Sequence, residues 1–138
     1  MSPSLHHAYV SGNIIATLHA LEEYSVFSEL ALQLDKDYVA DVCLYHKRSI
    51  NFAAGDVVKV TDIPLLIVEI LSPTQGTQEI LEKFAQYFQA GVQSCWLVIP
   101  VTQTVTVYSS MEYAKTFTEG DVIDSVLNIQ LSIRTIFD

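Results

Sequence analysis

A strongly apolar stretch of the sequence lies between Pro64 and Pro73, where six apolar residues surround a single carboxylate, that of Glu69. A continuous apolar run of this length is typical of a strand buried on both faces, in the middle of a mixed or parallel sheet. Because burying an unpaired ionised carboxylate costs several kcal/mol, Glu69 is expected to have a nearby cation, a metal ion or a shifted pKa. The alternative is that Glu69 lies at the solvent-exposed end of the strand and pairs with a neighbouring lysine.

Two further strands are predicted before this run. Residues 26–34 alternate loosely between apolar and polar positions, which is typical of a half-buried strand, and residues 35–37 form a turn. Residues 38–45 predict the second strand, which again contains one carboxylate, that of Asp41. Aspartate is unfavourable inside a strand, so Asp41 is a second anomalous carboxylate. Residues 46–63 are polar and predict a long exposed connection.

The start of the chain predicts a helix over residues 3–22. Ser2 is the expected N-cap, and Pro3 suits the first turn, where a missing backbone N–H costs nothing. A wide apolar face supports the helix, whereas Gly12 and Asn13 weaken its centre.

A second helix is predicted over residues 77–90, with Gly91 as its C-terminal cap. Its apolar stripe consists of Ile80, Leu81, Phe84, Tyr87 and Phe88. Lys83 lies on the flank of this stripe, from which its amine could reach over the sheet. The alternative partner of Lys83 is Glu79, one helical turn away, in an exposed pair worth only tenths of a kcal/mol.

The remaining pattern predicts strands. Residues 94–100 form a wholly apolar strand, which completes a strand–helix–strand unit expected to be a right-handed parallel crossover. Residues 104–108 alternate and predict a hairpin with that strand. Residues 112–117 and 128–137 are expected to form a further edge strand or a docked terminal segment. The pattern predicts one α/β domain over residues 1–138.

Composition narrows the class of protein. Half of the 138 residues are hydrophobic and 17% are charged, which indicates a globular chain with a sizeable core. No apolar run approaches the about 18 residues needed to span a membrane. The N-terminus lacks the layout of a secretory signal. Cys43 and Cys95 fit no metal-ligand spacing and are expected to be buried free thiols, so we expect a cytoplasmic protein.

The charge balance argues against one kind of partner. Seven Lys and Arg residues stand against sixteen Asp and Glu residues, which gives a net charge of −9, and the pI is about 4.6. Such a balance opposes non-specific contact with nucleic acid, whose phosphates attract basic surfaces. Any nucleic-acid function must therefore account for this deficit of positive charge.

Asp41, Glu69 and Lys83 together form a chemically meaningful set. Two carboxylates on adjacent strands can hold Mg²⁺ or Mn²⁺ through oxygen ligands and leave positions open for water. Such an ion can polarise a phosphate, and a nearby lysine can orient the attacking water. This is the chemistry of metal-dependent phosphodiester hydrolysis. A metal site at His6, His7 or His19 is a weaker alternative, because nothing at suitable spacing supports it.

The sequence resembles the Uma-type family of putative restriction endonucleases, a domain of unknown function with a PD-(D/E)XK-type nuclease core. The matching motifs are Ala40-Asp41-Val42, Val68-Glu69-Ile70-Leu71-Ser72-Pro73-Thr74, Lys83 with Tyr87, Ala90-Gly91-Val92 and Trp96-Leu97-Val98-Ile99-Pro100. The resemblance covers nearly the whole chain. It also includes Ser2-Pro3 with His7 and the closing part from Tyr108 to Phe137.

The resemblance implies a fold and an activity. The fold is of the α/β, restriction-endonuclease-like class, in which helices flank a mixed central sheet, with an α-β-β-β-α-β core and a C-terminal β extension. The implied activity is that of a Mg²⁺-dependent (or Mn²⁺-dependent) endonuclease that hydrolyses phosphodiester bonds in nucleic acid, namely DNA, as a homodimer. No membrane partner is implied.

The resemblance also assigns residues. It makes Asp41, Glu69 and Lys83 catalytic, and it gives the metal ion three ligands: Asp41, Glu69 and the backbone carbonyl of Ile70. The resemblance places His7, Glu79 and Tyr87 as neighbours of the pocket.

The chain departs from the family pattern at several positions. Leu71 stands where the motif has its lysine, and Lys83 on the following helix takes that place. Ala40 replaces the motif's proline, Glu79 replaces an Asp and keeps its charge, and Ile99 replaces an Asp at the end of a strand.

One departure favours a different function. Relatives carry an additional acidic β-segment before the Ser-Pro pair, and this chain begins at Met1-Ser2-Pro3, so one acidic ligand is expected to be missing. Together with the acidic charge, this favours the alternative of a catalytically degenerate nuclease-fold protein that acts as an interaction or assembly module.

Overall fold

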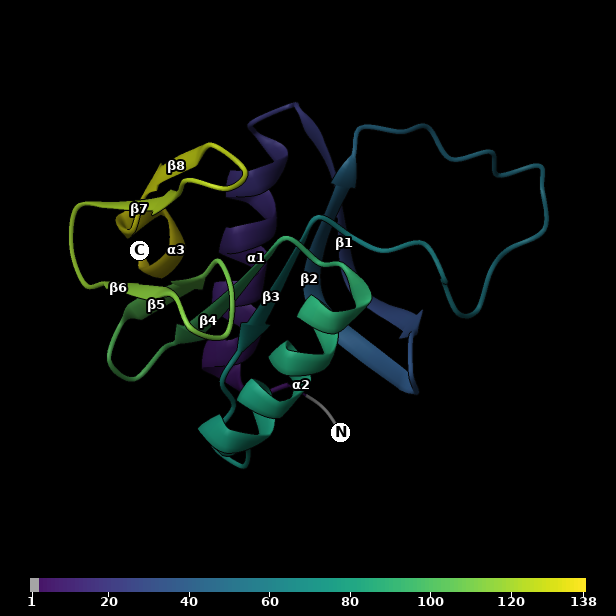
Figure 1. The fold of residues 1–138 in the computed structure, drawn as a ribbon. Coiled ribbons are helices and arrows are strands. Elements are labelled where there is room, and N and C mark those ends of the chain that lie inside the picture. The colour runs from purple at the N-terminus through teal and green to yellow at the C-terminus, as the bar shows by residue number, and fades with distance from the viewer. Residues whose placement is uncertain (1–2) are drawn as a thin grey trace.

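A computed structural model describes residues 3–138 of the chain (Figure 1). The helices are α1 (Leu5–His19), α2 (Thr77–Ala90) and α3 (Arg134–Phe137). The strands are β1 (Tyr24–Gln33), β2 (Asp37–His46), β3 (Leu66–Ile70), β4 (Ser94–Ile99), β5 (Thr104–Tyr108), β6 (Ala114–Phe117), β7 (Asp121–Asp124) and β8 (Ile129–Ser132). No helix in this part of the chain is both long enough and apolar enough to span a membrane.

Six strands form one mixed sheet in the order β1-β2-β3-β4-β5-β6, and β7 and β8 form a separate hairpin. Strands β3 and β4 are parallel and are joined through α2, as the strand–helix–strand pattern predicts. The other neighbouring strands of the sheet are antiparallel, including the predicted β4–β5 hairpin. The predicted α-β-β-β-α-β core with a C-terminal β extension is therefore confirmed.

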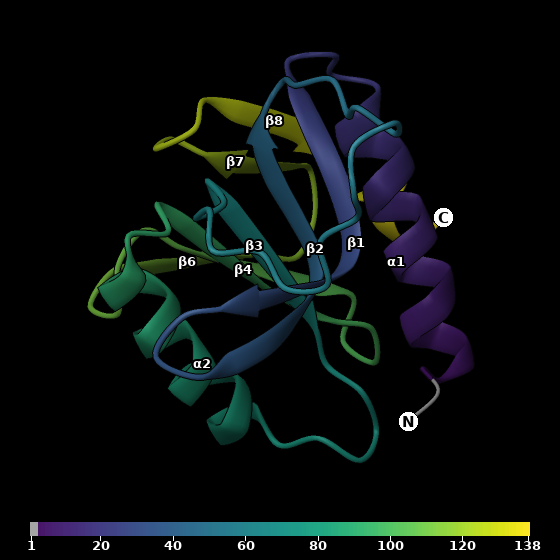
Figure 2. The same ribbon diagram turned by 90° about the vertical axis from the view of Figure 1, so that its right-hand side faces the viewer.

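The two long helices cover opposite faces of the sheet (Figure 2). Helix α1 packs Val10, Ile14 and Leu18 against the face that carries Val68. Helix α2 packs the predicted stripe against the other face, which carries Ile67 of the same strand. Strand β3 is thus buried on both sides, which explains its continuous apolar run.

The first helix is shorter than the predicted range of 3–22. It begins at Leu5 because the side chain of Ser4 accepts a hydrogen bond from the backbone nitrogen of His7 and acts as the N-cap. The predicted cap, Ser2, lies outside the described residues. The Gly12-Asn13 pair does not interrupt the helix, because the Asn13 side chain donates to the carbonyl of Ile136 in α3, 2.9 Å away.

The second helix has the predicted bounds. Gly91 ends it with φ 111°, a left-handed conformation that glycine adopts without steric cost. The backbone nitrogens of Gly91 and Val92 then donate to the carbonyls of Phe88 and Tyr87. This cap turns the chain directly into β4, so α2 is held against the strand that precedes it and the strand that follows it.

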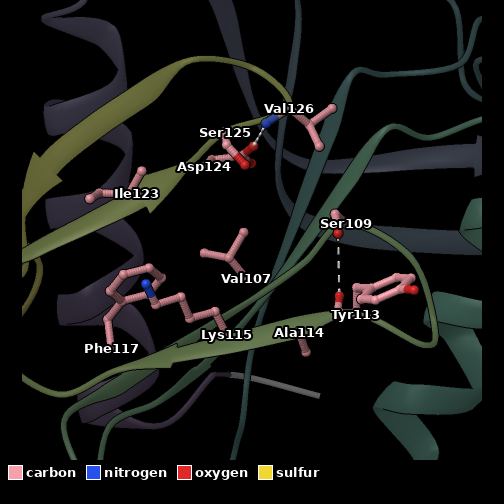
Figure 3. Close-up of a pocket in the computed structure, with 10 residues that line it drawn as sticks. All are labelled: Val107, Ser109, Tyr113, Ala114, Lys115, Phe117, Ile123, Asp124, Ser125 and Val126. Atoms are coloured by element: carbon pink, nitrogen blue, oxygen red, sulfur yellow. Dashed lines mark hydrogen bonds between the residues drawn. The ribbon is translucent and has the colours of Figure 1, made fainter.

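The C-terminal part of the chain contains more secondary structure than the sequence pattern predicts. Strand β6 is the expected edge strand of the sheet. Strand β8 and α3 lie in the segment 128–137, which was predicted only as an edge strand or a docked terminal segment, and β7 lies in a stretch with no predicted strand. A cleft of about 330 Å³ separates β7 from β5 and β6 (Figure 3).

The long connection between β2 and β3 is exposed, as predicted. It forms a short parallel bridge between Val60 and Leu32, next to which the backbones of the connection and β1 exchange hydrogen bonds. Cys43 and Cys95 are buried free thiols, which is also as predicted. Burial, and then the charge of Glu69, raise the pKa of Cys43 to about 12.

Candidate active site

The predicted site lies where β2 and β3 separate. Their pairing ends at Val42 and Val68, and the next backbone amides on each strand have no strand partner between them. The amide of Ile70 donates to Asp41 Oδ2 at 2.8 Å, and the amide of Asp41 donates to Glu69 Oε2 at 3.1 Å. The two anomalous carboxylates therefore cap each other's strand, which fixes both side chains side by side.

Strand β2 is irregular at Asp41, and this irregularity directs the Asp41 side chain toward Glu69. Ala40 packs on the α2 side of the sheet, whereas Val42 packs on the α1 side, although alternate residues of a regular strand share a face. Opposite Asp41, Glu29 of β1 has φ 49° and is missing from the pairing of the two strands. The β1–β2 hairpin bends here and carries its tip toward α2 (Figure 2). Irregularities of this kind are frequent next to active sites.

Lys83 joins the site from α2. Its Nζ lies 2.8 Å from Glu69 Oε1, so the alternative pair with Glu79 is not the contact that the structure shows. The Glu69 side chain is only 2% exposed, whereas that of Lys83 is 24% exposed. Glu69 therefore does lie near the end of its strand and does pair with a lysine, but it is not near solvent.

The surroundings of Glu69 disfavour the ionised form of its carboxyl group. Burial, and then the charge of Asp41, raise the pKa of the Glu69 carboxyl to about 7, while Lys83 and the amide of Asp41 oppose this rise. The sequence predicted a cation partner, a metal ion or a shifted pKa. The structure shows the first and the third of these together.

His7 was predicted as a neighbour of the pocket, but it lies closer to the centre of the site. Its Nε2 lies 3.1 Å from Asp41 Oδ2, and the residue is buried, with 8% of its surface exposed. The Ser4 cap fixes the first turn of α1, which places this imidazole against the sheet. Its Nδ1 is buried and has no hydrogen-bond partner among residues 3–138.

The other predicted neighbours differ in position. Tyr87 is fully buried beneath the site, and burial, followed by the charge of Glu69, raises the pKa of its hydroxyl. Glu79 lines an outer cleft of about 530 Å³ together with Lys83 and the tip of the β1–β2 hairpin. For Ile70 the structure shows the amide bound to Asp41, and the role of its carbonyl stays a prediction.

Sequence reasoning missed the contact between His7 and Asp41 and the buried carboxylate of Asp124. Asp124 accepts hydrogen bonds from Ser94 Oγ and Trp96 Nε1, at 3.1 and 2.9 Å. It also accepts from the amides of Val126 and Leu127, the first of which is drawn in Figure 3. The sequence of β7, Asp121-Val122-Ile123-Asp124, does not alternate between apolar and polar residues and gave no signal of this buried acid.

The donor set at the site suits a hard divalent cation. Asp41 and Glu69 contribute carboxylate oxygens, and the side chain of Asp41 is 21% exposed, which leaves it open to an ion. Burial, and then the charge of Asp41, disfavour the ionised form of Glu69 more than Lys83 favours it, and a bound cation would offset both effects. Residues 3–138 contain no cluster of three or more His, Cys, Asp or Glu side chains placed to hold a metal. A bound ion would therefore keep several water ligands, as Mg²⁺ commonly does.

A mixed sheet between two helices, with an acidic pair and a lysine at the end of a central strand, defines the restriction-endonuclease-like class of nuclease folds. The Uma2 family model, described as "Putative restriction endonuclease", matches residues 1–135, so the chain belongs to this family. No curated protein matches the chain.

A solved structure agrees with this assignment. The chain is similar to a protein from Anabaena variabilis described as "a putative nuclease belonging to DUF820". The TM-score is 0.82 at 21% sequence identity, and the alignment covers 99% of this chain and 83% of the other. At this level of identity the similarity establishes the fold.

Proposed function

We propose that this protein is a Mg²⁺-dependent endonuclease that hydrolyses phosphodiester bonds in DNA. The observation that supports this most directly is the convergence of Asp41, Glu69 and Lys83, which come from two strands and a helix, at one partly open point. Membership in a family described as "Putative restriction endonuclease" supports the same class of reaction.

The two carboxylates are the groups that would hold the cation. Asp41 presents the more exposed side chain, and Glu69 supplies a second oxygen ligand from inside the sheet. The family resemblance adds the backbone carbonyl of Ile70 as a third ligand. When bound, the ion supplies Lewis-acid activation of the phosphate and lowers the pKa of a coordinated water.

The remaining residues position these groups. Lys83 holds Glu69 through the 2.8 Å contact, and its partly exposed amine is placed to balance the negative charge that develops on a phosphate during hydrolysis. His7 holds Asp41 in the orientation that the amide of Ile70 also favours. Two protomers in a homodimer would present two such sites to the two strands of a duplex.

Cleavage of supercoiled plasmid DNA in Mg²⁺ tests the proposal. Asp41→Asn keeps the shape of the side chain and removes the charge that binds the ion, so we expect at least an about 100-fold lower cleavage rate. Asp121→Asn is the matched control, because it removes an equal charge at an exposed position in β7 and is expected to cleave as the wild type does. Equal rates for wild type and Asp41→Asn would reject the proposal.

A non-catalytic interaction or assembly module is the second candidate. The feature that favours it is the acidic cleft beside Lys83, which carries Asp35, Asp37, Glu79 and Glu82 and would repel a phosphate backbone. This candidate predicts that the wild type and Asp41→Asn show the same background cleavage, so the plasmid experiment distinguishes the two functions.

A further inference from the structure

A second cleft begins two residues beyond Glu69. The parallel pairing of β3 and β4 matches Glu69 with Leu97, and the amide of Leu71 continues it by donating to the carbonyl of Val98. Because side chains alternate along strands, Leu71 and Ile99 lie on the same face as Glu69, about 7 Å further along. The crevice outside the carboxyl ends of parallel strands is a common ligand site in α/β proteins.

This cleft has the size and lining of a site for a small planar ligand. Its volume is about 330 Å³, at the small end of the range for ligand pockets. Leu71, Pro73, Ile99 and Pro100 supply an apolar floor from the ends of the two strands. Leu71 is the residue that stands where the nuclease motif has its lysine, so the position that lost its amine contributes to this floor.

Polar groups lie on one side of the apolar floor. The first turn of α1 contributes Ser4 and the exposed His6, and the loop after β3 contributes Ser72. Figure 2 shows the start of α1 and this loop at the same end of the sheet. His6 directly precedes the residue that contacts Asp41, so the cleft borders the proposed active site.

The charge of the cleft distinguishes it from the one beside Lys83. None of the described residues that line it is acidic, whereas four acids line the cleft beside Lys83. In a protein with a net charge of −9, an acid-free surface next to the site is the side from which a polyanion can approach.

We propose that this cleft binds the nucleobase of the nucleotide next to the scissile phosphate, taken out of its stack. The apolar floor would cover the base, the imidazole of His6 would stack on it, and the serine hydroxyls would bond its edge. This inference rests on the proposed endonuclease function. Since a paired base must first leave the duplex to enter such a cleft, it also implies a preference for single-stranded or distorted DNA.

The test measures binding without cleavage. Fluorescence anisotropy in EDTA compares an oligothymidylate of about 15 nucleotides with an abasic strand of the same length and phosphate number. Because phosphate contacts are equal in both strands, the ratio of their dissociation constants isolates the contribution of the bases. We expect the wild type to bind the thymidylate at least about fivefold more tightly.

Two variants and two controls locate the effect. Ser72→Leu fills the cleft, and His6→Ala removes the stacking group at an exposed position, so both should lower the ratio to less than about twofold. Ser109 lines the separate cleft of about 330 Å³ shown in Figure 3, and His19 lies at the other end of α1. The control variants Ser109→Leu and His19→Ala should therefore both keep the wild-type ratio. Thermal unfolding verifies that each variant is folded.

The outcomes separate this inference from the proposed function. A wild-type ratio near one, or a ratio that Ser72→Leu and His6→Ala leave unchanged, overturns the cleft assignment even if plasmid DNA is cleaved. A fivefold ratio that both variants abolish supports the cleft. If the same protein then fails to cleave plasmid DNA, the endonuclease proposal fails and the base-binding cleft stands.

Discussion

Two buried carboxylates show how partners decide the role of a residue. Asp124 is fully buried and accepts four hydrogen bonds, from Ser94, Trp96 and two backbone amides, so its oxygens tie β7 to β4. Glu69 is equally inaccessible, but it has one amide, one lysine and a neighbouring carboxylate. Asp124 therefore stabilises the fold, whereas Glu69 has a raised pKa, and a bound cation would favour its ionised form.

The raised pKa of Glu69 predicts a specific dependence of stability on pH. The carboxyl titrates near 4.5 in the unfolded chain and near 7 in the folded protein, so the folded state holds its proton more tightly. Stability from this group is therefore full below pH 4.5 and is lost as the pH rises to 7. The Glu69→Gln side chain does not titrate, so the variant does not lose this stability as the pH rises. The free energy of unfolding of the variant, minus that of the wild type, should therefore increase by about 3 kcal/mol between pH 4.5 and 7.

Urea denaturation at several pH values between 4.5 and 8, with a chelator present, measures this difference. Titration of groups distant from Glu69 is common to both proteins and cancels. A difference that stays flat with pH, or that decreases as the pH rises, would contradict the electrostatic environment described for Glu69.

At the scale of elements, the ends of helices and strands position the site. The Ser4 cap places His7, the bend of β2 places Asp41, and α2 carries Lys83 over β3. The Gly91 cap matters because it fixes the angle at which α2 leaves toward β4. A substitution that disrupts one of these features would shift a site residue even though that residue itself is unchanged.

Two glycine substitutions should have opposite effects on stability. Gly91→Ala forces alanine to φ 111°, which should cost about 1 to 2 kcal/mol although the added methyl has free space. Gly12→Ala lies inside α1, where the methyl also meets nothing within 4 Å, and should stabilise the protein by about 0.5 to 1 kcal/mol. Thermal or chemical unfolding measures both. Effects of the same sign for the two variants would contradict the left-handed conformation of Gly91 or the helical conformation of Gly12.

Elements with a strong local signal were predictable from the sequence. Helix α2 combines an amphipathic stripe with a glycine cap, and both of its ends match the prediction. The carboxylates of Asp41 and Glu69 stood out because each interrupts an apolar strand. The short β7–β8 hairpin could not be foreseen, because contacts such as that of Asp124 with Trp96 order it, and these join distant parts of the chain. The approach of His7 to Asp41 depends on helix packing and is equally non-local.

At the scale of the whole molecule, charge controls how a nucleic acid could reach the site. The chain carries nine more negative than positive charges, and four acids and two lysines line the cleft between α2 and the β1–β2 hairpin. The cleft at the ends of β3 and β4 has no acid among its described lining residues. A substrate would therefore approach from the side of α1 and His6. The expected homodimer stays a prediction that sedimentation can test.

The central claim is that Asp41 and Glu69 hold a divalent cation beside Lys83. A crystal structure of the protein soaked in Mn²⁺, with anomalous scattering recorded, tests it most directly. We predict one strong anomalous peak within bonding distance of both carboxylates, absent from crystals of Asp41→Asn. A structure in which the two carboxylates stay bound only to the amides, His7 and Lys83, with no peak between them at saturating Mn²⁺, would contradict the account.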